Sequence, residues 1–209
     1  MSEIKIGKMT IGIAMTNTYF IYKEDSKEAI VIDPADRGEL IYDKLSEKGF
    51  EIKAILLTHG HFDHIWGVEK LKEKSGAIVY ASLLEKDFLA NPDANMSAHY
   101  DRPCKLIPDV FLKDDEEFEV ANISIKMLST PGHTLGGCCY YIKEAGFLIS
   151  GDTLFLESVG RTDFKGGSMS TLVRSINDKL LVLPDETKVY PGHGEPTTIA
   201  YEREYNPFL

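Results

Sequence analysis

Apolar runs of strand length alternate along the chain with segments that have the residue spacing of amphipathic helices. The predicted strands occupy residues 4–6, 17–22, 28–33, 54–57, 77–81, 118–128, 137–142, 146–149 and 187–190. The predicted helices occupy residues 36–49, 65–74, 83–89 and 169–180, with a short helix near the C-terminal end. Because strands and helices alternate in two successive blocks, the pattern predicts an α/β protein with two sheets that are covered by helices.

Residues 91–108 interrupt this alternation. The segment is polar and irregular, and prolines stand at positions 92, 103 and 108. Long segments without periodic structure lie on the surface of a domain and often shape the mouth of a site. We therefore expect a surface loop or lid here.

Composition narrows the class of protein. A chain of 209 residues is expected to form one domain over residues 1–209. Its 23 basic and 33 acidic residues give a formal charge of −10, and no cluster of Lys or Arg offers the contacts that nucleic-acid backbones require. No apolar run approaches the roughly 20 residues that span a bilayer. We therefore expect a small-molecule partner, rather than a nucleic acid or a membrane.

Cysteine usage bears on the cellular compartment. The three cysteines are an odd number, and two of them are adjacent: Cys104, Cys138 and Cys139. This arrangement does not resemble the disulfide framework of a small secreted protein. The sequence therefore predicts a cytoplasmic protein.

Histidine carries the candidate chemistry. Five of the six histidines lie in three short segments, 58–64, 131–133 and 191–193, and a fourth segment, 150–152, contributes Asp152. Each segment follows an apolar run and contains a glycine, which lets the backbone turn sharply beside a ligand. We expect these four strand ends to converge at one edge of the predicted sheets.

The spacing within residues 58–64 is that of metal ligands. His59 and His61 point the same way in an extended chain, so both can bind one ion. Asp63 and His64 follow one turn later and are placed to face a second ion. Imidazole and carboxylate ligands without a thiolate suit zinc, and also iron or manganese. The sequence thus predicts two divalent metal ions, with Zn²⁺ favoured.

The run from His59 to His64 resembles the His-x-His-x-Asp-His signature of the metallo-β-lactamase fold superfamily. His133, Asp152 and His193 match the later ligand positions of that superfamily in the same order, and the resemblance extends from residue 17 to residue 195. The resemblance implies a four-layer αββα sandwich that holds its metals at one edge, between the sheets.

The same resemblance implies a role for each matching residue. The first metal is assigned to His59, His61 and His133. The second metal is assigned to Asp63, His64 and His193. Asp152 bridges both metals, and Asp63 and Asp152 are the candidate catalytic residues. Asp33, at the end of its own strand, matches an aspartate that orients a ligand histidine, and such outer partners fix the tautomer and direction of the ring.

A finer resemblance lies in residues 151–155 and 159–164. Both segments are similar to those of the glyoxalase II branch, the hydroxyacylglutathione hydrolases, and of the neighbouring persulfide dioxygenases. Class B β-lactamases often have a cysteine where Asp152 stands, which disfavours an antibiotic substrate. Only residues 195–209 follow the last ligand, too few for the helical domain with which glyoxalase II enzymes contact glutathione. Arg161 is a candidate for the substrate pocket, or it forms a salt bridge with Asp163 that braces the loop.

Several functions are compatible with this ligand set. Two divalent ions that share a water can lower its pKa toward neutrality, so the leading prediction is hydrolysis of a small thioester or related acyl compound. The first alternative is a persulfide dioxygenase, in which His59, His133 and Asp152 hold a single iron. A lactonase is a further alternative. A nuclease is disfavoured by the charge of −10, and a non-catalytic module is disfavoured by the complete ligand set.

Overall fold

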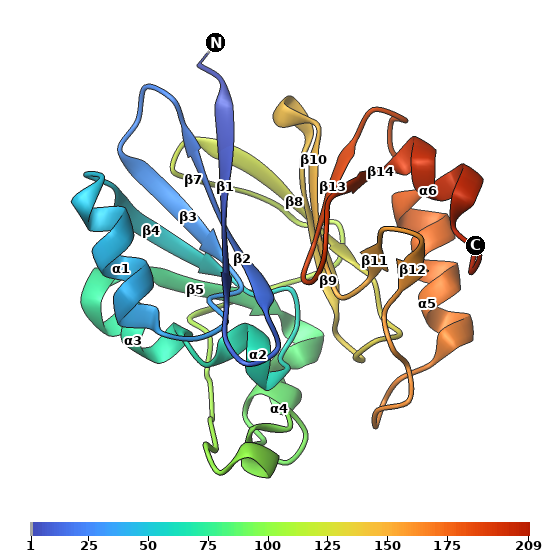
Figure 1. The fold of residues 1–209 in the computed structure, drawn as a ribbon, viewed down its shortest axis with the longest axis horizontal. Helices are drawn as coiled ribbons and strands as arrows, with labels where there is room; N and C mark the ends of the chain where they lie inside the picture. Colours follow the sequence, from blue (N-terminus) through green and yellow to red (C-terminus); the bar gives the residue numbers. More distant parts are fainter. Residues whose placement is uncertain (1) are drawn as a thin grey trace.

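The computed structural model describes residues 2–209 and places two six-stranded sheets face to face, with helices on both outer faces (Figure 1). Each sheet is built from its own half of the sequence, as the colours of the ribbon show. This arrangement confirms the predicted αββα sandwich. Within the described chain, no helix is both long and apolar enough to cross a membrane.

The first sheet keeps the order of the chain. It contains β1 (Ile4–Ile11), β2 (Thr16–Lys23), β3 (Glu28–Ile32), β4 (Glu51–Leu56), β5 (Ile78–Ser82) and β6 (Val110–Leu112). The first three strands are antiparallel, whereas β3, β4, β5 and β6 are parallel to one another. The carboxyl ends of these parallel strands therefore lie at the same edge of the sheet.

The second sheet is mostly antiparallel. From one edge it contains β7 (Glu117–Val120), β8 (Ile123–Ser129), β9 (Cys138–Ile142), β10 (Phe147–Gly151), β13 (Lys188–Pro191) and β14 (Thr197–Thr198). Because β9 is antiparallel to both β8 and β10, and β13 is parallel to β10, the strands β8, β10 and β13 all end at the same edge. A separate hairpin is formed by β11 (Leu154–Phe155) and β12 (Ser158–Val159).

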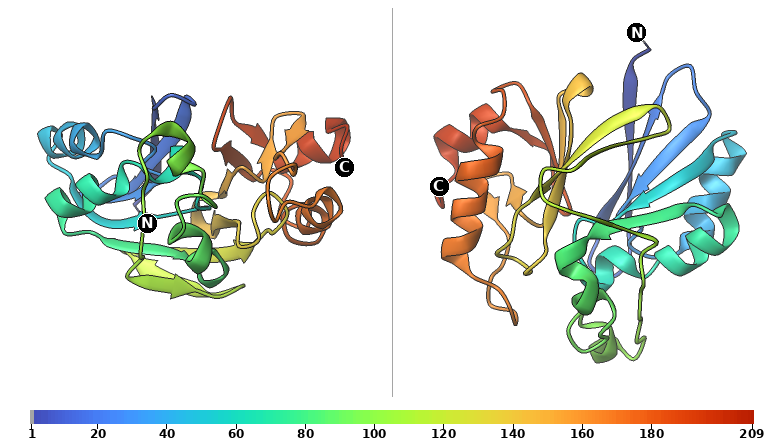
Figure 2. Two further views of the ribbon diagram at one scale, coloured as in Figure 1. Left: turned by 90° about the horizontal axis from the view of Figure 1, so that it is seen from below. Right: turned by 180° about the vertical axis from the view of Figure 1, so that it is seen from behind.

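Helices cover the outer face of each sheet, as two further views show (Figure 2). The first sheet is covered by α1 (Gly38–Glu47) and α3 (Val68–Ser75). The second is covered by α5 (Met169–Ser175), which continues into the π-helix η4 (Ile176–Leu180), and by α6 (Ile199–Tyr205). The remaining short helices are α2 (Phe62–Ile65), α4 (Lys86–Leu89), η1 (Leu83–Glu85), η2 (Ser97–Tyr100) and η3 (Lys143–Ala145).

The alternation of side chains along each strand divides the core into three parts. In β9, Cys138, Tyr140 and Ile142 face the first sheet, whereas Cys139 and Tyr141 face the outer helices. The strands β3 and β4 alternate in the same way between the central core and the helices α1 and α3. A strand that is buried on both faces has a continuous run of apolar residues, so these strands could be predicted from the sequence.

The structure differs from the predicted elements in several places. The predicted strand 118–128 is a hairpin of β7 and β8, because Ala121 and Asn122 both adopt positive φ in a two-residue turn. The predicted helix 65–74 is divided into α2 and α3 by a break at Trp66 and Gly67. The predicted irregular segment 91–108 contains the helix η2. The strands β6, β11, β12 and β14 were not predicted, because runs of two or three residues carry no periodicity.

Candidate metal centre

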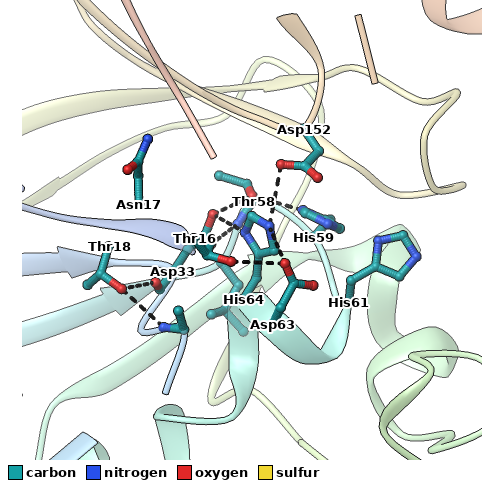
Figure 3. A network of polar contacts seen from close by, with 12 residues as sticks. Thr16, Asn17, Thr18, Asp33, Thr58, His59, His61, Asp63, His64 and Asp152 are labelled. Carbon is teal, nitrogen blue, oxygen red and sulfur yellow. Dashed lines mark hydrogen bonds and ion pairs between the residues drawn. The ribbon is translucent and has the colours of Figure 1, made fainter. Parts of the chain in front are cut away.

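Four chain segments bring the predicted ligands together at the edge where the strands end. The segment after β4 carries His59, His61, Asp63 and His64, and Figure 3 shows Asp152 on the opposite segment, in contact with His64, which also contacts Asp63. The other three segments follow β8, β10 and β13, and they carry His133, Asp152 and His193. The structure therefore places all seven predicted residues in one cluster.

The first group consists of His59, His61 and His133, whose ligand atoms all lie within 4.8 Å of one another. His61 Nδ1 is 2.9 Å from His133 Nε2, and all three side chains are buried. The first two histidines come from the first sheet and the third comes from the second sheet. This group therefore joins the two halves of the fold.

The second group consists of Asp63, His64 and His193, with ligand atoms again within 4.8 Å. Asp63 Oδ2 is 3.3 Å from His193 Nε2 and 3.6 Å from His64 Nε2. Asp152 stands between the groups: its Oδ1 is 3.4 Å from His64 Nε2, and its Oδ2 is 3.6 Å from His133 Nε2. One carboxylate is thus in reach of both groups.

The cluster leaves buried polar atoms without partners. Among the described residues, His59 Nε2, His64 Nε2 and Asp152 Oδ1 are buried and make no hydrogen bond. Buried polar groups are normally hydrogen-bonded, so three orphaned atoms at one point require an explanation. Imidazole nitrogens and carboxylate oxygens are ligands of divalent transition metals, and the cluster contains no thiolate. The residues present therefore fit a pair of such ions.

Asp33 holds the histidines from behind, at the end of β3. Its Oδ2 accepts a hydrogen bond from His64 Nδ1 at 2.9 Å and another from Thr58 Oγ1 at 2.6 Å, and its Oδ1 accepts one from the Thr58 backbone amide. Since the Thr58 hydroxyl gives its hydrogen to Asp33, it accepts from His59 Nδ1 at 3.1 Å. Both imidazoles therefore turn Nε2 toward the cluster.

Three of these supporting contacts were not predicted from the sequence. Thr58 is the residue before His59, so its place in the motif was the one available signal. Thr16 donates from Oγ1 to Asp63 Oδ2 at 2.9 Å, and no pattern near residue 16 marked it. The backbone carbonyl of Arg161 accepts from His133 Nδ1 at 2.7 Å, and a contact made by a carbonyl leaves no trace in side-chain identity.

The electrostatics of the cluster differ from one ligand to the next. Burial, with the neighbouring histidines, lowers the pKa of His59 well below its usual range and that of His61 to about 3. Burial also opposes the charged form of His193, but hydrogen bonds with Asp152 and Asp63 raise its pKa to about 9. Burial disfavours ionisation of Asp152 as well, but His64 and His193 hold its pKa well below its usual range. The two carboxylates are ionised and the imidazoles of His59 and His61 are neutral. Burial opposes the charged form of His64, but Asp152, Asp63 and Asp33 raise its pKa well above its usual range. His64 and His193 therefore favour protons that bound metal ions would displace.

A cavity of about 640 Å³ opens in front of the cluster. Its floor is formed by His61, Asp63, His133, Asp152 and His193. Its walls include the aromatic residues Phe62, Tyr100, Phe155 and Phe164. A larger cavity of about 1040 Å³ lies over the outer face of the second sheet, but none of the predicted site residues lines it.

Arg161 lines the cavity and also forms the predicted salt bridge. Its guanidinium pairs with Asp163, with Nη2 2.8 Å from Oδ2, and lies 4.4 Å from the centre of the Phe164 ring. Both charged side chains are about two-thirds exposed, at 67% and 65%. Arg161 is therefore placed both to contact a substrate in the cavity and to brace the loop through its salt bridge.

Comparison with known proteins gives the family. The model of the Metallo-beta-lactamase superfamily matches residues 11–193, so the chain belongs to this superfamily. The probable metallo-hydrolase YqgX of Bacillus subtilis (strain 168) is 39% identical over 209 residues, which cover 99% of this chain and 98% of the relative. The hydroxyacylglutathione hydrolase GloC of Haemophilus influenzae is 34% identical, over 89% of each chain. The chain is therefore a metallo-hydrolase of this superfamily.

Solved structures agree with the fold. The BLEG-1 B3 metallo-beta-lactamase has a TM-score of 0.93 at 37% identity and covers 98% of this chain and 99% of its own. TTHA1623 in a di-iron-bound form has a TM-score of 0.85 at 33% identity, with 97% and 100% covered. ETHE1 from Myxococcus xanthus has a TM-score of 0.82 at 29% identity, with 97% and 83% covered.

Proposed function

We propose that this protein is a dinuclear metal-dependent hydrolase that cleaves a small thioester. The observation that carries the proposal is the position of Asp152, whose two oxygens reach both ligand groups at the floor of the cavity. A carboxylate shared between two ligand sets is what a pair of ions with a common water requires. The relative GloC, a hydroxyacylglutathione hydrolase by name, supports the thioester.

The ligand groups define which residues would hold each ion. The first ion would be held by His59, His61 and His133, and the second by Asp63, His64 and His193, with Asp152 between them. When bound, two divalent ions, most simply Zn²⁺, would lower the pKa of a shared water and polarise the acyl carbonyl. No serine or cysteine nucleophile is needed for this chemistry.

Asp63 is the residue placed to handle the proton of the attacking water. Burial opposes its ionisation, but His64 and His193 lower its pKa, so the carboxylate is charged. Thr16 donates a hydrogen bond to Oδ2 and fixes the orientation of the side chain. An ionised, oriented carboxylate at the cavity floor can accept a proton at one of its oxygens.

The cavity determines what can bind. A volume of about 640 Å³ is that of a small-molecule site. Aromatic walls suit an apolar acyl or thiol substituent, and Arg161 at the cavity offers a cation to an anionic end of the substrate. These features support a small acyl compound with a mainly apolar body.

The decisive experiment combines metal analysis of the purified protein with turnover assays. We expect two zinc ions per chain and hydrolysis of a thioester in preference to lactones, persulfides and β-lactams. Asp152→Ala should lose metal and lower kcat/KM by more than about 100-fold, because removal of outer-shell partners alone costs 10- to 100-fold. Asp178→Ala removes an exposed carboxylate beside the remote cavity and should change neither quantity. An Asp152→Ala variant with unchanged metal content and rate would contradict the proposal.

A persulfide dioxygenase is the second candidate, because imidazole and carboxylate ligands also suit iron and the similar protein TTHA1623 was solved in a di-iron-bound form. In that case a single iron would be held by His59, His133 and Asp152. One iron per chain with oxygen consumption on a persulfide would replace the thioester proposal. Preferential hydrolysis of a β-lactam would replace both, in line with the name of the similar BLEG-1 protein.

A further inference from the structure

Glu85 is a buried acid that none of the assigned ligand groups contains. It ends the helix η1, directly after β5, and only 1% of its surface is exposed. No Lys or Arg in residues 2–209 forms a salt bridge with it, and burial raises the pKa of its carboxyl to about 7. Burying an unpaired carboxyl group costs free energy, so this position calls for a reason.

One oxygen of Glu85 binds the segment that follows His133. Glu85 Oε1 accepts a hydrogen bond from the hydroxyl of Thr134 and another, at 3.0 Å, from the backbone amide of Gly136. Gly136 also packs directly on η1, because a Cβ at that position would lie 2.4 Å from the Glu85 backbone nitrogen. Glu85 therefore fixes the backbone on the C-terminal side of a predicted ligand.

The other oxygen faces the backbone between two further ligands. Glu85 Oε2 is buried without a hydrogen-bond partner among the described residues, and a Cβ on Gly60 would lie 3.0 Å from it. Gly60 stands between His59 and His61. The same carboxylate is thus in contact with both segments that supply the first ligand group, one from each sheet.

We propose that Glu85 is a positioning residue for the first metal site, which sets the separation of His133 from His59 and His61. The inference rests on the proposed metal centre. Metal–ligand distances must be right to about 0.2 Å, yet these ligands come from loops on opposite sheets. Because the Glu85 side chain contacts both loops, it can fix the distance between them. Within residues 2–209, Glu85 forms no hydrogen bond or ion pair with Asp63, His64 or His193, so its effect is expected at the first site.

The test measures metal affinity at each site separately. Co²⁺ or Zn²⁺ is titrated against a chromophoric chelator, in a His193→Ala background for the first site and a His61→Ala background for the second. Glu85→Ala should weaken the first site by about 10- to 100-fold, the range found for outer-shell partners. The second site should keep its affinity. Glu85→Gln keeps an oxygen that can accept from Thr134 and Gly136, so it should restore affinity to within about threefold.

Glu202 provides a matched control for the loss of a buried acid. It is also fully buried, in α6, and accepts hydrogen bonds from Thr197 Oγ1 at 2.5 Å, Asn206 Nδ2 at 2.7 Å and the Glu157 amide at 3.0 Å. Glu202→Ala should therefore lower stability without changing either metal affinity. If Glu85→Ala does not fold, Thr134→Val provides the same test. This variant removes one hydrogen-bond donor to Glu85 and should also weaken metal binding at the first site.

Each outcome separates this inference from the proposed function. Wild-type protein that binds no metal would end the proposal of a metal centre, and this inference with it. Wild-type protein with two ions, but with unchanged first-site affinity in Glu85→Ala and Thr134→Val, would overturn the role of Glu85 alone. Equal weakening of both sites, or equal weakening by Glu202→Ala, would likewise reduce Glu85 to a structural residue.

Discussion

At the scale of single residues, Asp33 connects both halves of the candidate metal centre. It binds His64 directly and reaches His59 through the hydroxyl of Thr58. A carboxylate only accepts hydrogen bonds, so it fixes the direction of each bond in the chain behind it. One ligand of each group is therefore held in the tautomer that presents Nε2.

Replacement of Asp33 tests this arrangement. Asp33→Ala should weaken zinc binding by about 10- to 100-fold, because His64 loses the partner that fixes its tautomer. Chelator competition at constant pH measures the change. Asp109→Ala is the control: Asp109 also accepts a hydrogen bond from a backbone amide, that of Val79, but it lies on the surface away from the cluster. Equal affinities for the two variants would contradict the role of Asp33.

Glu85 makes stability depend on pH in a defined direction. Its pKa is about 7 in the folded protein against an ordinary value of 4.5. Between these pH values Glu85 is ionised in the unfolded chain but still protonated in the folded protein. Its contribution to the free energy of unfolding therefore falls as the pH rises from about 4.5 to about 7. Glu85→Gln cannot titrate, so its unfolding free energy relative to wild type should rise over this window, by at most about 3 kcal/mol.

Urea denaturation of the chelated proteins across this pH range measures the effect. The difference between variant and wild type cancels the titration of all other groups to first order. Parallel profiles for the two proteins would show that Glu85 does not carry the shifted proton.

At the scale of elements, a hydrogen bond across the central core joins the two sheets. Tyr140, in β9, is fully buried and donates from its hydroxyl, at 2.8 Å, to the carbonyl of Leu57, the residue directly after β4. Leu57 lies two residues before His59, so this bond also anchors the loop that carries most of the ligands. The packing of the sheets and the position of the site are thereby linked.

Tyr140→Phe should lower the unfolding free energy by about 1–2 kcal/mol, because it leaves the Leu57 carbonyl without its main partner in the core. The urea midpoint should fall while the slope of the transition stays the same. Tyr141→Phe is a matched control in the same strand, since the Tyr141 side chain faces the other way and its hydroxyl makes no hydrogen bond within residues 2–209. Equal losses in both variants would exclude a specific contribution from the bond.

Much of the secondary structure could be predicted because the strands are buried on both faces. Val31 and Ile32 face different cores, so both are apolar and the run is continuous. The break between β7 and β8 was missed because Ala121 and Asn122 do not form one of the common Gly-containing turn pairs. The helix η2 was missed because its four residues are too few to show a period.

The candidate metal residues were predictable for a different reason. Few types of side chain bind divalent metal ions, so a ligand position accepts few other residues and its pattern can be recognised in a sequence. The supporting groups are less restricted: a hydroxyl, as in Thr16, occurs in many residues, and the Arg161 carbonyl is part of the backbone. Only folding brings these groups to Asp63 and His133. Glu85 is 48 residues away from His133 in sequence and meets its neighbour Thr134 only after the sheets have packed.

At the scale of the whole molecule, metal ions should stabilise the assembled fold, because the first ligand group takes residues from both sheets. Binding only to the folded state adds about 4 kcal/mol when the ligand is at a thousand times its Kd. We therefore expect chelation to lower Tm and renewed zinc to restore it. Asp152→Ala should show little change on chelation. A wild-type Tm that does not respond to chelation would contradict the prediction.

The cavity walls and the candidate metal ligands come largely from separate pieces of chain. Ala14, Met96, Tyr100 and Phe155 line the cavity from the β1–β2 turn, the 91–108 segment and β11, none of which supplies a ligand. Insertions or exchanges in those surface segments can therefore remodel the entrance while the candidate metal centre stays intact. Proteins with this fold can therefore change their substrate specificity while they keep the same reaction chemistry.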